Sequence, residues 1–191
     1  YQRAPDFIVI EGALAGGHLG FKKEDLENQT YQSLEEIFQE VEQVVESFQL
    51  NIPIFVAGGI HQRSDVKHFF ELGVDGVQVA SRFIPTYECD ASMKYKEAFL
   101  KAKKEEVGLV SSPVGMPGRA FQNAFVQKTK QEKVPIKKCY QCLTPCNLKT
   151  TPYCISRALI EAVKGNLDEG LIFTGAYGYM QDHLMHVEEV I

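Results

Sequence analysis

The alternation of apolar and polar positions in the first 80 residues predicts three strands separated by helices. Apolar runs rich in β-branched residues cover residues 7–10 and 54–57, and a shorter one covers residues 76–80. Continuous apolar runs of this length are typical of strands that are buried on both faces, as in a parallel sheet. Each run ends in small residues, which marks the end of the strand.

Between these runs the apolar positions recur at intervals of three and four, which predicts helices. The clearest case is residues 34–48, where Ser33 is in a position to act as the N-cap. A second helix is expected over residues 64–72, ending at Gly73 in the left-handed conformation that glycine favours. Strands that alternate with helices at this spacing predict an α/β fold with a parallel sheet, either open or closed into a barrel.

The rest of the chain is less regular. Helices are expected over residues 91–106, 121–130 and 155–164, and residues 111–119 are expected to form a loop because prolines and glycines punctuate them. We therefore expect βα units over residues 1–130 and a helical and irregular extension, which contains four cysteines, over residues 131–191.

Composition narrows the class of function. The 191 residues carry a net charge of −5 with 45% hydrophobic residues, which argues against a nucleic-acid partner and favours a small-molecule substrate. The longest apolar runs are too short to cross a bilayer, so no membrane partner is expected. The chain shows no basic, apolar leader at its start, and we expect a cytoplasmic protein.

Small residues follow all three expected strands. They are residues 12–17 after the first strand, Gly58 and Gly59 after the second, and Ala80 and Ser81 after the third. In parallel α/β folds ligands bind at the carboxyl ends of strands, where glycines let backbone N–H groups approach a phosphate. The alternative is that the Gly58–Gly59 pair only turns a corner.

His18 lies among the small residues that follow the first strand. An imidazole has an unperturbed pKa of roughly 6.5, which suits it to abstract a proton near neutrality. A purely structural role is the alternative, since most single histidines are not catalytic. His61, which follows the glycine pair, is a weaker candidate.

The cysteines are the main feature of the extension. Cys139, Cys142, Cys146 and Cys154 provide four soft ligands within sixteen residues. That number suffices for tetrahedral zinc or an iron–sulfur cluster, although the spacing fits neither common pattern. Reduced structural thiols and disulfides are the alternatives. Cys89 is remote from the others and is expected to be a packed thiol.

Four motifs together resemble one known family. The segments PDFIVIEGALAGGHLGF, IPIFVAGGI, GVDGVQVASRF and SPVGMPGRAFQNAFV occur in this order. They are similar to the C-terminal half of the nitronate monooxygenases, formerly 2-nitropropane dioxygenases, and the flavin-dependent enoyl-ACP reductases share the same barrel. The resemblance covers about residues 6–128. It implies the C-terminal part of a (β/α)8 TIM barrel that binds FMN without a covalent bond.

The resemblance also implies roles for individual residues. In the family the histidine of the Ala-Gly-Gly-His motif is the catalytic base, which here is His18. The residues expected to contact FMN are Glu11, Gly16, Gly17, Gly58, Gly59, Ala80 and Ser81. Ala80–Ser81 replaces the family's Gly-Thr pair, and we expect binding to survive because Ser81 keeps the hydroxyl group.

The implied activity is oxidation of nitronates or nitroalkanes by O2. An NAD(P)H-dependent enoyl-ACP reductase is the first alternative, and a non-catalytic scaffold with a metal-binding tail is the second. A family member carries about five further βα units before the matched region, and three strands cannot close a barrel. The expected partner is therefore the missing half of the barrel or further copies of the chain.

Overall fold

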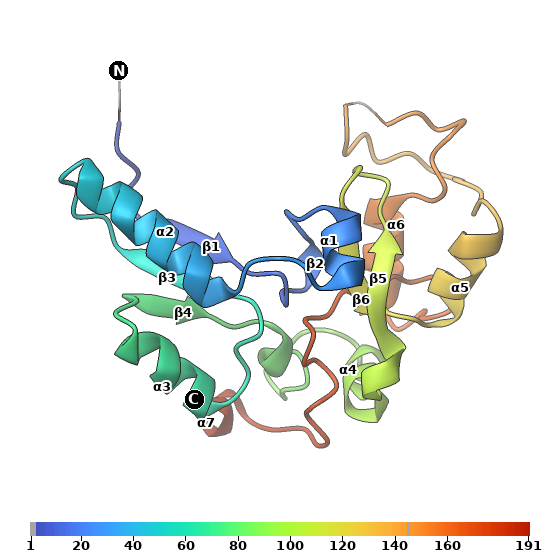
Figure 1. Ribbon diagram of the computed structural model, residues 1–191. Coiled ribbons are helices and arrows are strands. Elements are labelled where there is room, and N and C mark those ends of the chain that lie inside the picture. Colours follow the sequence, from blue (N-terminus) through green and yellow to red (C-terminus); the bar gives the residue numbers. More distant parts are fainter. Residues whose placement is uncertain (1–2, 145) are drawn as a thin grey trace. The chain divides into compact units, whose positions relative to one another are not determined.

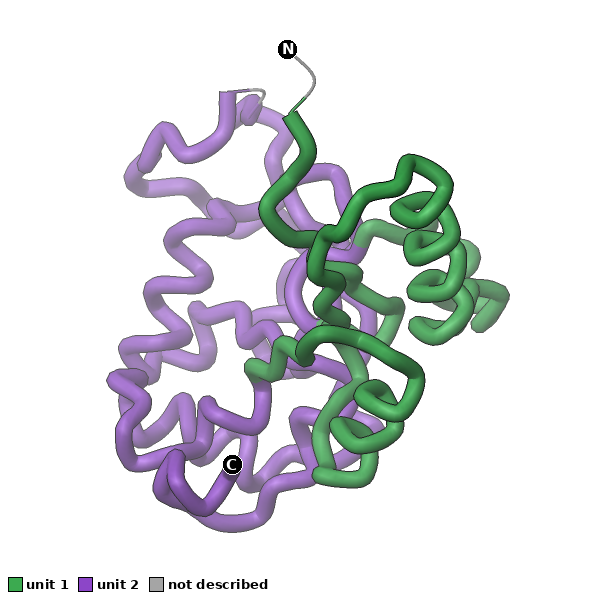
Figure 2. Tube along the Cα trace, turned by 90° about the vertical axis from the view of Figure 1, so that its left-hand side faces the viewer, with its two compact units in different colours: residues 1–15, 20–80 green, residues 16–19, 81–191 purple. Residues whose placement is uncertain are grey.

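The computed structural model describes residues 3–144 and 146–191 (Figure 1). The chain divides into two compact units (Figure 2). The described part of the first unit comprises residues 3–15 and 20–80, and that of the second unit comprises residues 16–19, 81–144 and 146–191. No helix in the described residues is both long enough and apolar enough to cross a membrane.

The first unit is built on a parallel sheet with the strand order β1-β3-β4. Its strands are β1 (Ile8–Glu11), β3 (Ile54–Ala57) and β4 (Gly76–Gln78). The register pairs Ile8 with Ile54 and Phe55 with Gly76. The helices of this unit are α1 (Lys23–Asn28), α2 (Leu34–Ser47) and α3 (Arg63–Glu71). The parallel βα arrangement expected from the sequence is confirmed, whereas the short helix α1 was not anticipated.

The two longer helices of this unit begin and end at the expected signals. Ser33 caps α2 by accepting a hydrogen bond from the Glu36 amide, while the Glu36 carboxylate accepts one from the Ser33 amide. Such a reciprocal pair satisfies two amides that the helix itself leaves without partners. After α3, Gly73 adopts a φ of +100°, which reverses the chain toward β4.

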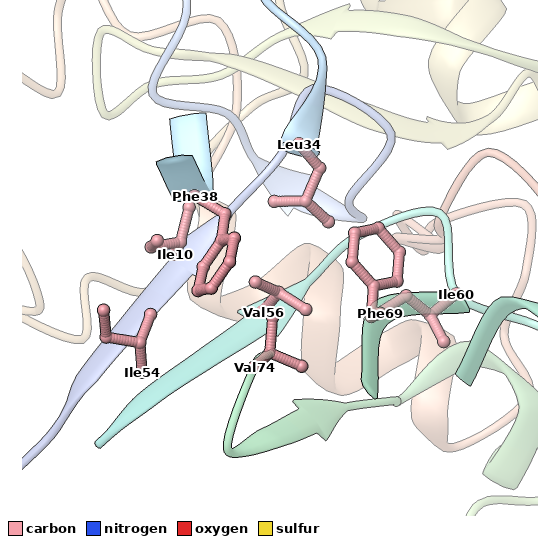
Figure 3. Close-up of a cluster of buried hydrophobic side chains, with 8 residues drawn as sticks. All are labelled: Ile10, Leu34, Phe38, Ile54, Val56, Ile60, Phe69 and Val74. Carbon is pink, nitrogen blue, oxygen red and sulfur yellow. The ribbon is translucent and has the colours of Figure 1, made fainter. Parts of the chain in front are cut away.

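The core of the first unit lies between one face of the sheet and the helices α2 and α3 (Figure 3). Its buried members are Ile10, Leu34, Phe38, Ile54, Val56, Ile60, Phe69 and Val74. The prediction that residues 7–10 form a strand buried on both faces is wrong. Phe7 is 58% exposed and Val9 is 41% exposed, because only the side that carries Ile10 packs against this core.

The second unit contains an antiparallel sheet with the strand order β2-β6-β5. Its strands are β2 (Gly17–His18), β5 (Val107–Ser111) and β6 (Pro117–Phe121). The prediction of a continuous loop over residues 111–119 is wrong, since β5 and β6 form a hairpin in which only residues 112–116 turn. Pro117 is tolerated because it is the first residue of its strand.

The remaining elements of the second unit are helical. They are η1 (Ser81–Phe83), α4 (Met93–Lys101), η2 (Lys104–Glu106), α5 (Ala124–Gln131), α6 (Ile155–Val163) and α7 (Val187–Val190). The helix expected over residues 91–106 is therefore divided into α4 and η2. The residues after 130 pack with the hairpin, because Tyr153 and Leu171 share a buried cluster with Val110 and Ala120. The division of the chain at residue 130 stays a prediction.

Candidate functional site

In the first unit, the loops that follow β1 and β3 pack backbone against backbone. A Cβ atom added at Gly58 would lie 2.9 Å from the amide nitrogen of Ala15 and 3.0 Å from the carbonyl oxygen of Gly12. Gly58 and Gly59 also adopt φ values of +93° and +80°. Glycine is thus required here both by the backbone conformation and by close packing. These two requirements are enough to explain the Gly58–Gly59 pair without a ligand.

The same geometry leaves hydrogen-bond donors available. In the described part of the chain, neither the Gly58 amide nor the Gly59 amide donates a hydrogen bond. Two amides that precede α3 are occupied, since the Asp65 carboxylate accepts from the His61 amide at 2.9 Å and from the Gln62 amide at 2.7 Å. A phosphate at this loop would therefore use the glycine amides and not those of His61 and Gln62.

Two further candidates of the first unit lie at the carboxyl ends of strands. Glu11 is the last residue of β1, and its side chain is exposed. Partial desolvation nevertheless raises the pKa of its carboxyl group. Ala80 lies two residues beyond the end of β4 and is also exposed. Neither side chain makes a contact that fixes a functional role.

In the second unit, Gly16 and Ser81 are both close to one backbone amide, that of Gly175. A Cβ atom added at Gly16 would lie 2.6 Å from the amide nitrogen of Gly175. The same nitrogen donates a hydrogen bond to the Ser81 hydroxyl at 2.9 Å. The Ser81 oxygen is therefore an acceptor in this bond, and its own proton remains free to donate to a ligand.

His18 is held in β2 by the strand ladder and by two side chains. Gly17 pairs with Arg119 and His18 with Gly118 of β6. The Nε2 atom of His18 lies 2.7 Å from the Oγ atom of Ser112. The ring also makes an edge contact with Phe173, with 5.0 Å between ring centroids. These contacts fix the imidazole in one orientation on a regular element of structure.

The electrostatics of His18 suit a base. The side chain is half-buried, and burial lowers its pKa below the ordinary value of 6.5 because the charged form loses hydration. The ring is therefore neutral at neutral pH. Within the described residues no side chain or backbone group hydrogen-bonds Nδ1, so one ring nitrogen is available to a ligand.

The four cysteines of the extension share one cavity of about 310 Å³. Its lining includes Cys139, Cys142, Cys146, Cys154, Pro113 and Tyr153. All four thiols are free, and Cys139 and Cys142 are exposed. Across residues 3–144 and 146–191, no three His, Cys, Asp or Glu side chains are grouped so that they could hold a metal ion. The prediction of zinc or an iron–sulfur cluster therefore receives no support from the structure.

Sequence reasoning missed the partners of His18. Ser112 lies inside the SPVGMPGRAF motif, but the segment was expected to be a loop with no assigned contact. Phe173 lies in the extension, and nothing in its sequence position indicates that it contacts His18. A prediction of the β5–β6 hairpin would have brought Ser112 close to the strand that pairs with His18.

The family model for nitronate monooxygenase matches residues 1–191. The matching curated relatives include proteins named "Probable nitronate monooxygenase". The one from Staphylococcus saprophyticus is 32% identical over 66% of this chain and 34% of its own length. The one from Bacillus subtilis is 28% identical over 68% of this chain and 36% of its own length. The match thus spans about a third of the length of these relatives.

Solved structures share the fold. FabK from Thermotoga maritima matches with a TM-score of 0.69 and 24% identity, over 97% of this chain and 51% of that one. Nitroalkane oxidase from Streptomyces ansochromogenes matches with a TM-score of 0.67 and 20% identity, over 97% of this chain and 49% of that one. The expectation of an α/β fold of the TIM-barrel type is confirmed. Since the family model covers the whole chain, the chain belongs to the nitronate monooxygenase family of enzymes.

Proposed function

We propose that this chain is part of an FMN-dependent oxidoreductase that oxidises nitronates or nitroalkanes with O2. The observation that carries the proposal is His18, a half-buried imidazole fixed on a strand with one ring nitrogen free of partners among the described residues. Membership of the family and the names of the curated relatives agree with this substrate class. A small nitro compound and O2 are then the partners of the enzyme.

The residues present fit a flavin phosphate. The Gly58 and Gly59 amides have no acceptor among the described residues, and a side chain at Gly58 would clash with the backbone of Gly12 and Ala15. The Ser81 hydroxyl keeps a proton to donate. Within the first unit we assign the phosphate to the Gly58 and Gly59 amides. Glu11, Gly16, Gly17, Ala80 and Ser81 remain the further flavin contacts that the family resemblance implies. FMN supplies the redox chemistry when it is bound, since it can accept an electron pair.

The protein contributes a base and its orientation. With a neutral nitroalkane, the proton on the carbon next to the nitro group is transferred to His18, and the electron pair of the broken C–H bond moves into the nitronate. A preformed nitronate has already lost that proton and makes no use of the base. General-base catalysis contributes on the order of 10²–10⁴-fold, so His18 matters for the first substrate and much less for the second.

The test uses the full-length protein purified without added flavin. The proposal predicts a yellow protein that releases FMN on denaturation and whose flavin absorbance bleaches anaerobically with the anion of 2-nitropropane. Bleaching by NAD(P)H, with the colour restored by an enoyl thioester but not by O2, would instead indicate the enoyl reductase alternative. A colourless protein that does not bind added FMN would refute the flavin assignment.

A further inference from the structure

Backbone hydrogen bonds hold the segment around Phe173 against β6. The Phe121 amide of β6 donates a hydrogen bond to the Ile172 carbonyl oxygen at 3.0 Å. The Thr174 amide donates one to the Arg119 carbonyl oxygen of the same strand at 3.2 Å. Ile172 and Thr174 are also buried. The residues on both sides of Phe173 are therefore anchored, which gives its side chain a defined position in the second unit.

The Phe173 ring occupies the space next to two glycines of the β2–β6 ladder. A Cβ atom added at Gly118 would lie 3.0 Å from Cε1 of the ring, and one added at Gly17 would lie 3.9 Å from Cδ2. The first distance is shorter than an ordinary contact between carbon atoms, which is roughly 3.5–4.0 Å. Since Gly118 pairs with His18 in the ladder, the missing side chain at Gly118 leaves room for the ring beside the imidazole.

The imidazole of His18 is held at two points. Its ring centroid lies 5.0 Å from that of Phe173, and the two planes meet at 73°, an edge-on arrangement that aromatic rings favour. Its Nε2 atom lies 2.7 Å from the Ser112 hydroxyl oxygen. A hydrogen bond at one ring atom leaves the ring free to turn about that atom, whereas packing against a second ring restricts this motion. The contact with Phe173 therefore defines the imidazole plane.

We propose that Phe173 is a positioning residue, which keeps the imidazole of His18 in the orientation from which it takes the substrate proton. The inference rests on the proposed function, in which His18 is the base. A base that is already oriented needs no rearrangement before proton transfer, and a displacement of about 1 Å can cost about 100-fold in rate. Through Phe173, the extension contributes a residue to the candidate site.

The same ring shields His18 from water. Burial lowers the pKa of His18 because the charged imidazolium loses hydration, and Phe173 packs directly against the imidazole. Both partners of the imidazole named above, the Ser112 hydroxyl and the Phe173 ring, are uncharged. A smaller side chain at position 173 admits water to the imidazole, so the pKa of His18 should then rise toward its ordinary value of 6.5.

The test is Phe173→Leu in the full-length, FMN-loaded protein, which keeps an apolar side chain and removes the aromatic ring. NMR titration of histidine-labelled protein, with the His18 signals assigned from His18→Ala, follows the imidazole without turnover. We expect the wild-type ring protons of His18 to carry a ring-current shift and to titrate below pH 6.5. In Phe173→Leu the ring-current shift should disappear and the titration midpoint should move up.

Kinetics provide the second readout. We expect kcat for 2-nitropropane to fall by about 10–100-fold in Phe173→Leu, while kcat for its preformed anion stays close to that of the wild type. Phe173→Tyr keeps the ring and should restore most of the rate. Phe38→Leu is the matched control, because Phe38 is a buried core phenylalanine of the first unit. It should lower stability but keep the His18 signals and both rates of the wild type.

Three results would overturn the inference. They are wild-type His18 signals in Phe173→Leu, equal losses of kcat with the neutral substrate and the anion, and changes of the same size in Phe38→Leu. If Phe173→Leu does not fold, Phe173→Met removes the ring with a smaller change in volume, and unaltered His18 signals there would also refute the proposal. Because the NMR signals are measured without turnover, a protein inactive toward nitro compounds would contradict the proposed function but leave this test intact.

Discussion

The substitution Gly58→Ala tests the backbone packing that shapes the candidate phosphate loop. The new methyl group meets two obstacles in the first unit. The alanine must adopt a φ of +93°. Its methyl carbon comes within 2.9 Å of the Ala15 nitrogen and 3.0 Å of the Gly12 oxygen. Ordinary contacts between such atoms lie at roughly 3.5–4.0 Å, so one loop must move away from the other.

Each obstacle has an expected cost in free energy. A left-handed conformation costs an L-residue about 1–2 kcal/mol, and overpacking of a tight contact typically costs about 1–3 kcal/mol. We therefore expect Gly58→Ala to lower the free energy of unfolding by about 2–5 kcal/mol. The displaced loop should also weaken FMN binding, because the amides of Gly58 and Gly59 would no longer keep their positions.

Two matched variants separate the two costs. Gly115→Ala has a positive φ of +85° with nothing within 4 Å of the added methyl group, so it carries only the conformational cost of about 1–2 kcal/mol. Gly20→Ala has neither obstacle and should stay within about 0.5 kcal/mol of the wild type. The assay is urea unfolding of the full-length protein, followed by circular dichroism. A loss in Gly58→Ala no larger than that in Gly115→Ala would refute the packing argument.

Three further predictions follow from the site and the fold. Ser33→Ala should lower the unfolding free energy by about 1 kcal/mol, because it removes the N-cap of α2. Ser33→Thr should keep most of that stabilisation, because threonine also caps helices. Equal losses in the two variants would contradict the capping role. The acidic limb of the pH profile of kcat/KM for 2-nitropropane should lie below pH 6.5, because burial lowers the pKa of His18 and the base stays neutral to lower pH; a limb at or above 6.5 would contradict this. Metal analysis of protein never exposed to chelators should find zinc and iron well below one per chain, since no ligand group is formed in residues 3–144 and 146–191; a value near one would reverse that conclusion.

The sequence predicts the first unit better than the second. Local signals determine the strands and helices there, as when Ser33 begins α2 and Gly73 ends the turn after α3. The exposure of Phe7 was not predictable in this way, because burial depends on what covers the second face of the sheet. A periodic pattern indicates which face of the sheet a helix covers, but it does not indicate what covers the opposite face.

The second unit depends on contacts between distant residues. Ser112 and His18 are 94 positions apart, and their hydrogen bond follows from the pairing of β2 with β6. Proline and glycine punctuate the hairpin, so its strands look like a loop until the antiparallel ladder is known. The family resemblance points to His18, but its aromatic partner Phe173 comes from the extension, where the cysteines are the most conspicuous feature of the sequence.

The central claim is that His18 removes a proton from a nitro substrate next to a bound flavin. The most direct test is the anaerobic rate of flavin bleaching in the full-length His18→Ala variant, compared with the wild type, for 2-nitropropane and for its preformed anion. The account predicts a loss on the order of 10²–10⁴-fold with the neutral substrate and a far smaller loss with the anion. Equal losses with both substrates, or no loss with either, would contradict the assignment of His18 as the base.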